Sequence, residues 1–310
     1  MKSGFVAIIG RPNVGKSTFL NAIIGKKIAI MSNKPQTTRN TISGVYTTEE
    51  EQIIFIDTPG IHKPHNELGQ RMTNSAYQST RGVDAILWMI SAKEHFTVGE
   101  EMIIENIKNT KTPVFLCINK IDLLKNRSDV DKIILEYKDK MNFQGIYPIS
   151  ALEKQNIEHV INDISELLPE GPQYYPSDMI TDHPEKFLIA EIIREKVLIN
   201  TEEEVPHSVA VVIDMLKPNE DNPNVIDCYA SIYVERKSQK GIIIGAGGAM
   251  LKKIGSQARK DIINILPDKS KFDIGRIAPT KRVINTPINP NLQGTIISIY
   301  SRSERVAWCW

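Results

Sequence analysis

Short apolar runs alternate with amphipathic stretches through the first half of the chain. Apolar runs of strand length are Phe5 to Ile9, Ile53 to Ile56, Ala85 to Ile90, Val114 to Ile118 and Ile146 to Ile149. Strands buried on both faces appear as continuous apolar runs, and helices with one apolar face cover them. The pattern predicts an α/β fold, a mostly parallel sheet with helices on both faces, and a ligand site at the carboxyl ends of its strands.

The pattern changes after Leu168, where prolines and a glycine favour an extended linker. Beyond it, the spacing of apolar residues predicts a helix that begins near Pro184, strands at His207 to Met215 and Val225 to Val234, and a helix from Ala249 to about Leu266. This order predicts a second, α+β domain. The predicted divisions are 1–168 for the first domain, 169–183 for the linker, 184–270 for the second domain and 271–310 for a partly disordered C-terminal segment.

Composition and charge narrow the class of protein. A chain of 310 residues is long enough for about two domains. Its 41% apolar and 24% charged content is typical of globular proteins, and no apolar run approaches the roughly 18 residues of a membrane span. Cys117, Cys228 and Cys309 are too widely spaced for a disulfide framework or a zinc site. Because the first predicted strand leaves no room for a signal peptide, we expect a reducing cytoplasm.

A glycine-rich stretch joins the first apolar run to the helix-like segment Thr18 to Ile24. It reads Gly10-Arg11-Pro12-Asn13-Val14-Gly15-Lys16-Ser17, the phosphate-loop pattern G-x-x-x-x-G-K-S. In such a loop backbone N–H groups and a helix N-terminus converge on one anion, Lys16 adds charge for the β- and γ-phosphates, and Ser17 ligates Mg²⁺. A glycine-rich turn that binds nothing is disfavoured by the strand before and the helix after. The candidate phosphate-binding residues are Gly10, Asn13, Val14, Gly15, Lys16, Ser17 and Thr18.

A second segment with chemical significance, Asp57-Thr58-Pro59-Gly60, follows the next apolar run. An aspartate at the carboxyl end of a strand can hold Mg²⁺ through its water shell, and the Gly60 N–H can contact the γ-phosphate. Read alone, the segment is a Pro-Gly turn; beside a phosphate loop it is typical of a nucleotide site. Asp57 and Ser17 are candidate metal ligands, and Lys16 and Gly60 are candidate catalytic residues.

Two later strand ends carry residues suited to guanine. The Asp122 carboxylate of Asn119-Lys120-Ile121-Asp122 can accept hydrogen bonds from N1–H and the exocyclic amine of guanine, a donor pair that adenine lacks. The stem of Lys120 would lie along the base, and Asn119 would tie this loop to the phosphate loop. Ser150-Ala151-Leu152 would supply a backbone N–H to guanine O6. The predicted nucleotides are GTP and GDP, with Mg²⁺.

These motifs, in this order, resemble the translation-factor-type small GTPases and, more narrowly, the Era family. The narrower resemblance is carried by Lys34-Pro35-Gln36-Thr37-Thr38-Arg39 and by Ile61-His62-Lys63-Pro64. In the family a threonine of the first switch completes the Mg²⁺ site. Thr37 and Thr38 are both candidates for that catalytic and metal-binding role, and the sequence does not choose between them.

Ile61 has a consequence for the mechanism. Ras-type enzymes place a water-positioning glutamine directly after this glycine, but isoleucine can neither donate nor accept a hydrogen bond. We therefore expect slow intrinsic hydrolysis, with water placed by another group such as the switch I backbone. His62 and His65 are minor candidates for a base. Arg71 and Arg81, on a predicted switch helix at 66–82, are better suited to surface salt bridges than to catalysis.

The second domain carries a glycine turn in basic surroundings. Gly245-Ala246-Gly247-Gly248 lies in the stretch from Arg236 to Lys260, which holds Lys and Arg but no Asp or Glu. A G-x-x-G turn between helices lets a nucleic-acid backbone approach closely, and flanking charges attract phosphates. The order of elements resembles a type II KH domain, although a flexible loop and a solvated helix face are alternatives. The candidate RNA-binding residues are Lys240, Gly245, Ala246, Gly247, Gly248, Lys252 and Lys253.

Two features depart from the family pattern. The turn has Ala246 where the family has a basic residue, which removes one phosphate contact. The expected third strand and the basic, Trp-bearing closing segment are not evident after Lys271, although Thr295 to Tyr300 fits a strand. We hypothesise that the last forty or so residues, which end in Trp308-Cys309-Trp310, derive from a shifted reading frame or a cloning junction.

The resemblance implies a GTP-hydrolysing switch that binds 16S ribosomal RNA near its 3′ end and assists assembly of the 30S small ribosomal subunit. It also implies a monomer in the cytoplasm with peripheral association at the inner face of the cell membrane. Two other functions stay open: an RNA-binding module in which nucleotide only stabilises the fold, and a regulatory GTPase that acts on a protein or membrane partner. Asp57 and the switch threonines favour a working GTPase, because a structural nucleotide site would not need them.

Overall fold

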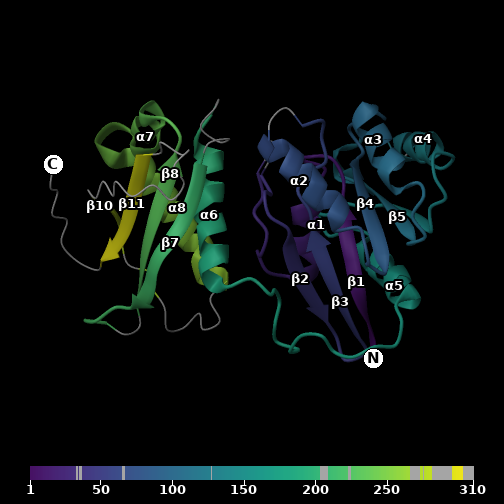
Figure 1. Ribbon diagram of the computed structural model, residues 1–310, viewed down its shortest axis with the longest axis horizontal. Helices are drawn as coiled ribbons and strands as arrows, with labels where there is room; N and C mark the ends of the chain where they lie inside the picture. Colours follow the sequence, from purple (N-terminus) through teal and green to yellow (C-terminus); the bar gives the residue numbers. More distant parts are fainter. Residues whose placement is uncertain are drawn as a thin grey trace. The chain divides into compact units, whose positions relative to one another are not determined.

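The computed structural model divides the chain into two compact units, Met1–Asp182 and His183–Trp310, which we describe separately (Figure 1). The structure describes residues 1–32, 34, 37–64, 67–126, 128–202, 209–222, 225–265, 273–274, 276–280 and 295–302. Several residues singled out in the sequence lie outside these ranges, among them Pro35, Gln36, His65 and Trp308 to Trp310.

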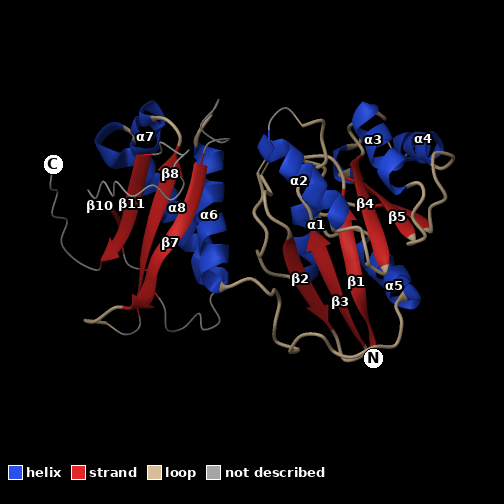
Figure 2. Ribbon diagram, viewed as in Figure 1, coloured by secondary structure: helices blue, strands red, loops and turns tan. Residues whose placement is uncertain are grey.

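A six-stranded sheet forms the centre of the first unit, in the order β2-β3-β1-β4-β5-β6 (Figure 2). Its strands are β1 Lys2–Ile9, β2 Ile42–Thr47, β3 Glu51–Asp57, β4 Ala85–Ser91, β5 Val114–Asn119 and β6 Gly145–Pro148. The pairings are parallel except that β2 runs antiparallel to β3. The predicted α/β fold class is confirmed, and β2 is a strand that the apolar pattern missed.

Helices cover both faces of this sheet. They are α1 Lys16–Ile24, α2 Glu67–Gln78, α3 Val98–Ile107, α4 Ser128–Tyr137 and α5 Ile157–Leu167. On one face Trp88 of β4 lies in a buried cluster that receives side chains from α2, α3 and α4. On the other face Phe19 of α1 meets Phe55 of β3 edge to face, with ring centroids 6.3 Å apart. These layers leave the carboxyl ends of the strands for the motif loops.

The predicted linker is hydrogen-bonded to the first unit. Gln52 of β3 is fully buried, and its side-chain carbonyl accepts from the backbone N–H groups of Tyr174 and Tyr175 at 2.8 and 2.9 Å. Its amide donates to the Tyr175 carbonyl at 2.8 Å. Further along, the Val45 N–H of β2 donates to the Ile180 carbonyl at 2.9 Å. The linker is therefore attached to the strand that follows the first switch.

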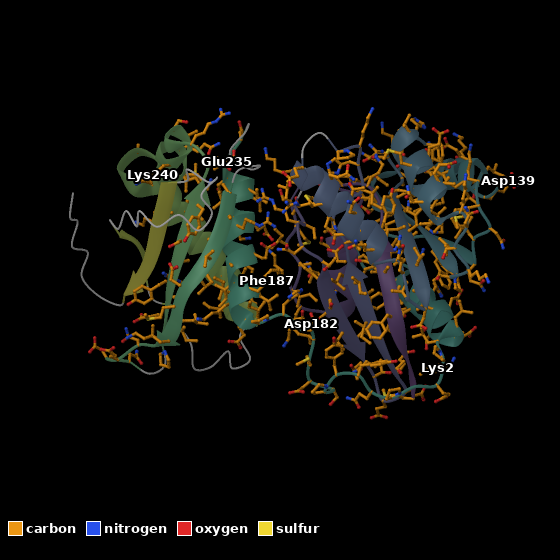
Figure 3. The ribbon with its side chains drawn as sticks, viewed as in Figure 1. Lys2, Asp139, Asp182, Phe187, Glu235 and Lys240 are labelled. Atoms are coloured by element: carbon orange, nitrogen blue, oxygen red, sulfur yellow. The ribbon has the colours of Figure 1, made fainter. Side chains whose placement is uncertain are left out.

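The second unit packs helices against an antiparallel hairpin, with α6 lying against both β7 and α8. Its elements are α6 Glu185–Asn200, β7 Val209–Pro218, β8 Val225–Val234, α7 Lys237–Ile244 and α8 Ala249–Ile265. The glycine turn lies between α7 and α8, as the sequence predicted. Lys240 is on α7 at that end of the unit (Figure 3).

The sheet of this unit continues past residue 270, contrary to expectation. Strand β11, Thr295–Arg302, pairs antiparallel with β8 from Thr295↔Val234 to Ile299↔Ala230, and β10, Arg276–Thr280, pairs with β11. The short strand β9, Asp273–Ile274, pairs with the start of β8. The third strand that seemed absent from the sequence therefore closes the sheet, at the segment that best fitted a strand.

The sequence raised three questions about the chain: membrane spans, disulfides and metal-binding side chains. Within the ranges given above, no helix is both long and apolar enough to cross a membrane. Cys117 and Cys228 are buried free thiols. Among those same residues, no group of three or more His, Cys, Asp or Glu side chains is arranged to hold a metal ion.

Candidate nucleotide site and RNA interface

The phosphate loop connects the end of β1 to the start of α1. Gly15 is the N-cap of α1 and has φ 105°, a left-handed conformation that glycine adopts without strain. A Cβ at this position would lie 2.2 Å from the side-chain nitrogen of Asn119, so no larger residue fits beside that amide. The first turn of α1 thus opens toward the loop, where N–H groups can meet an anion.

Lys16 is buried in the loop. Its ammonium donates to the carbonyls of Gly10 at 3.0 Å and Arg11 at 2.8 Å. Burial lowers the pKa of Lys16 to about 8, an effect that the nearby Asp57 partly offsets. An anion beside the ammonium would favour its charged form, which is the interaction expected of a phosphate-loop lysine.

Three oxygen-bearing side chains converge next to this lysine. The Ser17 hydroxyl donates to Asp57 Oδ2 at 2.7 Å and lies 3.0 Å from the Thr38 hydroxyl. Asp57 is fully buried, and its Oδ1 has no hydrogen-bond partner among the described residues. Burial raises the pKa of Asp57 to about 6, opposed by Lys16 and by the Ser17 hydrogen bond. A buried carboxylate with one unpartnered oxygen, next to the Ser17 hydroxyl, is chemically suited to a hard cation such as Mg²⁺.

The structure separates the two switch threonines. Thr38 lies beside Ser17, whereas the Thr37 hydroxyl donates to the Lys34 carbonyl at 2.6 Å. Gly60 packs against the phosphate loop, where an added Cβ would lie 2.6 Å from the Pro12 backbone nitrogen, and its carbonyl is 2.9 Å from His62 Nδ1. Of the two threonines, Thr38 is therefore the one brought to the candidate metal site.

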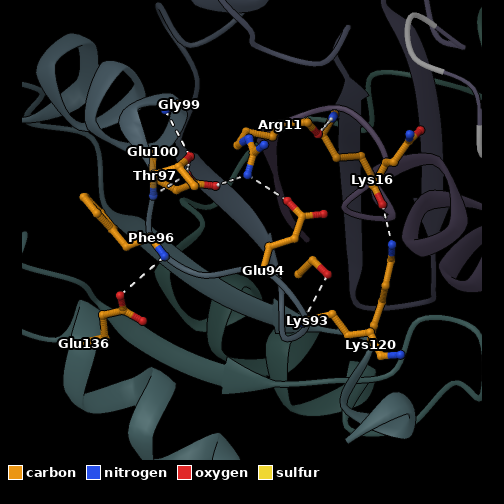
Figure 4. A network of polar contacts seen from close by, with 12 residues as sticks. Arg11, Lys16, Lys93, Glu94, Phe96, Thr97, Gly99, Glu100, Lys120 and Glu136 are labelled. Carbon is orange, nitrogen blue, oxygen red and sulfur yellow. Dashed lines mark hydrogen bonds and ion pairs between the residues drawn. The ribbon is translucent and has the colours of Figure 1, made fainter.

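Asn119 joins the loops that follow β1, β5 and β6. Its amide donates to the Val14 carbonyl at 2.8 Å, and its carbonyl accepts from the Ala151 N–H at 2.9 Å. Lys120 Nζ donates to the Asn13 carbonyl at 2.5 Å, and Figure 4 shows this side chain reaching the phosphate loop. The predicted base-binding loop is thus tied directly to the predicted phosphate-binding loop.

The remaining base-site residues lie around the same edge of the sheet. The Ser150 hydroxyl donates to Asp122 Oδ1 at 2.5 Å, which orients the carboxylate predicted to read guanine. Leu152 is 70% exposed at the rim. The predicted phosphate-binding, metal-binding and base-binding loops are therefore brought together at the carboxyl ends of the strands, and Thr37 points away from them.

The glycine turn of the second unit has an open outer surface. Gly245 has φ 71°, and a Cβ there would lie 2.7 Å from that of Met250. At Gly247 an added Cβ would meet nothing within 4 Å. Ala246, Lys252 and Lys253 are exposed around this opening. The turn can therefore admit a phosphate backbone, with lysines on the adjoining first turn of α8.

Comparison with known proteins places both units. The family model of the 50S ribosome-binding GTPases matches residues 5–120, and that of the KH domain matches residues 204–300. A crystal structure of Aquifex aeolicus Era, a Tyr-to-Ala variant bound to GDP and AlF4⁻, is 44% identical, with a TM-score of 0.83 over 88% of this chain and 93% of its own. The chain belongs to the Era family of GTPases.

A second Era structure, in complex with MgGDPNP and nucleotides 1506–1542 of 16S ribosomal RNA, is 43% identical, with a TM-score of 0.82 over 88% of this chain and 92% of its own. Membership of the Era family confirms the resemblance drawn from the motifs. The KH match extends to residue 300, and the hypothesis of a foreign C-terminal segment stays untested. The end of the chain at Trp308 to Trp310 lies outside the described residues.

Sequence reasoning missed one polar contact of the phosphate loop in this Era-family protein. Arg11 Nη1 donates to Glu94 Oε2 at 2.7 Å and to Glu100 Oε1 at 3.2 Å (Figure 4). The sequence offered one signal, because Thr97-x-x-Glu100 is a capping-box pattern at a helix start. Arg71, in contrast, forms the expected surface pair with Glu67, at 2.5 Å.

Ile61 is fully buried, in the same core cluster as Ile9 and Ala76. Its N–H donates to the Gly10 carbonyl at 3.0 Å, which fixes its backbone beneath the phosphate loop. The side chain therefore packs into the core, consistent with the expectation that this position does not order water. A glutamine side chain at this position would place its amide in the apolar core, away from the phosphate site.

We predict that Ile61→Gln lowers the free energy of unfolding by about 2–4 kcal/mol, because it buries an amide in an apolar cluster. Ile61→Val should cost only about 1 kcal/mol, since it removes a single methyl group. Urea unfolding of both variants measures the difference.

Leu135→Gln is the matched control, because Leu135 is 59% exposed on α4 of the same unit. It should stay within about 0.5 kcal/mol of the parent protein. An Ile61→Gln variant as stable as this control would contradict the buried position of the side chain.

Proposed function

We propose that this protein is a GTP-hydrolysing switch that binds 16S ribosomal RNA near its 3′ end and assists assembly of the small ribosomal subunit. The observation that carries the proposal is the convergence of Lys16, Ser17, Thr38 and Asp57 at one sheet edge, tied through Asn119 to the loop that bears Asp122. The Era relatives solved with GDP and AlF4⁻, and with MgGDPNP and a 16S fragment, support it.

Mg²⁺ would be held by Ser17, Thr38 and Asp57 and would neutralise charge on the β- and γ-phosphates. Lys16 would contact the same phosphates from the loop, with its ammonium directed by the Gly10 and Arg11 carbonyls. Asp122, oriented by Ser150, would select guanine. Because Ile61 is buried, we assign the placement of the attacking water to backbone groups of the first switch and to Gly60.

The attachment of the linker gives the switch a route to the second domain. Thr38 lies a few residues before β2, and β2 holds the linker through the bond from Val45 to Ile180. Gln52 of the neighbouring strand accepts hydrogen bonds from the linker N–H groups of Tyr174 and Tyr175. A change of the first switch on loss of the γ-phosphate would therefore reach the residues that carry the KH domain.

The second domain would bind single-stranded RNA through the glycine turn. The open space at Gly247 admits a phosphate, and Lys240, Lys252 and Lys253 add salt-dependent attraction. Which bases the second domain recognises stays a prediction. The same holds for the protein's cytoplasmic location, its peripheral association with the membrane and its monomeric state.

Thr38→Ala should weaken Mg²⁺-dependent binding of a GTP analogue by about tenfold, the effect of losing roughly one hydroxyl ligand. Thr37→Ala should change it by no more than about twofold, because its hydroxyl bonds the Lys34 carbonyl instead. Fluorescent-nucleotide titrations with and without Mg²⁺ make the comparison. A larger effect for Thr37→Ala would reverse the assignment.

Ala246→Lys should raise RNA affinity a few-fold and increase the slope of log affinity against log salt by about 0.7, the value for roughly one added contact to single-stranded phosphate. Asn264→Lys adds the same charge at the other end of α8 and serves as the control. Filter binding to the 3′ segment of 16S RNA between low and moderate salt measures both. Equal effects of the two variants would show general attraction rather than a contact at the turn.

Crosslinking of GTP-analogue-loaded and GDP-loaded protein to RNA in extract, followed by sequencing, tests the whole proposal. Enrichment of the 16S 3′ segment mainly with the GTP analogue is the expected result. The Lys252→Ala/Lys253→Ala variant should lose RNA but keep nucleotide, which separates the two sites. RNA recovered equally in both nucleotide states would contradict coupling, and no recovery would contradict the RNA-binding role.

A further inference from the structure

The side chain of Arg11 connects the phosphate loop to the region around the N-terminus of α3. A single nitrogen, Nη1, donates to Glu94 Oε2 at 2.7 Å and to Glu100 Oε1 at 3.2 Å (Figure 4). Both contacts are charge-assisted, which makes them stronger than hydrogen bonds between neutral groups. One guanidinium is therefore shared by two carboxylates, one from the loop after β4 and one from the first turn of α3.

Glu100 is a fixed support for this contact. Its side chain is only 3% exposed, and Oε2 accepts from the Thr97 N–H at 3.0 Å and from the Thr97 hydroxyl. The bond from the Thr97 N–H is one half of a capping box at the start of α3, in which the Thr97 side chain accepts from a backbone N–H of the first turn. The stem of Arg11 also passes close over Gly99, where an added Cβ would lie 2.9 Å from Arg11 Cδ. The Arg11 side chain is therefore held by Glu100 and packed against Gly99 at the N-terminus of α3.

The backbone of the same arginine holds the catalytic lysine. The Arg11 carbonyl accepts from Lys16 Nζ at 2.8 Å, beside the Gly10 carbonyl at 3.0 Å. Because the Lys16 side chain is buried, the positions of these two carbonyl acceptors determine where its ammonium is held. The seat of the Arg11 side chain is therefore linked through one residue to the position of Lys16.

The two halves of the phosphate loop are held by different parts of the unit. Asn119 and Lys120 bond the carbonyls of Val14 and Asn13 in the second half. For the first half, Arg11 supplies side-chain contacts, in addition to the bond from the Ile61 N–H to the Gly10 carbonyl. The two sets of contacts therefore hold different parts of the loop, residues 10–11 and residues 13–14, both of which precede Lys16.

We propose that Arg11 is a positioning residue for phosphate binding and hydrolysis: the carboxylates of Glu94 and Glu100 seat its guanidinium, and this seat directs its carbonyl and hence Lys16. The inference rests on the proposed GTPase function. It assigns to the α3 end a role in the affinity for β- and γ-phosphates, separate from the recognition of guanine by Asp122.

Binding of fluorescent GDP and competition by GMP, both below the melting temperature, test this role. Arg11→Ala should weaken GDP binding by about tenfold, the loss expected for roughly one charge-assisted contact, and should lower kcat. GMP binding should change by no more than about twofold, because GMP lacks the β-phosphate that Lys16 contacts. A general loss of structure would weaken both nucleotides alike.

Conservative variants separate charge from packing. Arg11→Lys should restore GDP affinity to within about threefold, because one ammonium can replace the single nitrogen that makes both contacts. Glu100→Gln keeps a side chain able to complete the capping box but removes the charge, and should weaken GDP binding several-fold. Glu105→Gln, which breaks the exposed pair with Lys108 on the same helix, is the matched control and should change nothing.

Each outcome separates the possibilities. Equal losses of GDP and GMP affinity in Arg11→Ala, or a lower melting temperature with unchanged GDP affinity, would overturn the positioning role. Failure of Arg11→Lys to restore binding would also overturn it, because the carboxylate seat would not be what matters. A parent protein that bound no GDP would contradict the proposed function itself rather than this inference alone.

Discussion

The side chain of Asn119 is the constraint on which the rest of the site depends. It is 2% exposed, donates to the Val14 carbonyl and accepts from the Ala151 N–H. These two bonds fix the spacing between loops that leave separate strands of the sheet. The position of Gly15 follows from the same amide, since a Cβ there would collide with it. A single buried amide thereby ties the loop predicted to bind phosphate to the loops predicted to bind the base, which preorganises the candidate site.

The site also contains two buried charges that the protein alone stabilises poorly. Burial works against the ammonium of Lys16 and the carboxylate of Asp57, and their mutual attraction only partly offsets it. Ser17 contributes one hydrogen bond to the carboxylate. Groups held in this way gain most from ligands of opposite charge, which matches a phosphate for Lys16 and a divalent cation for Asp57. The burial that disfavours the charged forms of Lys16 and Asp57 therefore also favours binding of a phosphate and a divalent cation beside them.

The linker leads from the first unit to the unit that carries the glycine turn. Gln52 uses both polar atoms of its side chain to hold the linker backbone, and Val45 adds a strand-like contact at the edge of β2. Such bonds are directional and are lost abruptly when a strand shifts. In the second unit, Gly245 shapes the glycine turn because its positive φ of 71° and its closeness to Met250 exclude a side chain.

Local motifs were sufficient to predict much of the site. The phosphate loop and Asn119 to Asp122 were readable because their residues are contiguous and because parallel strands bring their carboxyl ends to one edge. The central strands were readable from their apolar runs. The edge strand β2 escaped notice because its pattern is mixed, and β11 was not recognised as closing the sheet because its pairing with β8 joins segments far apart in the chain.

By itself, then, the sequence determined the fold class, the nucleotide motifs and the G-x-x-G turn. The tertiary structure decided which way individual side chains point. It brought Thr38 rather than Thr37 to Ser17, and it directed Ile61 into the core. It also seated Arg11 on Glu94 and Glu100, which lie 83 and 89 positions away. Side-chain direction and long-range pairing depend on packing between elements, and spacing along the chain does not encode that packing directly.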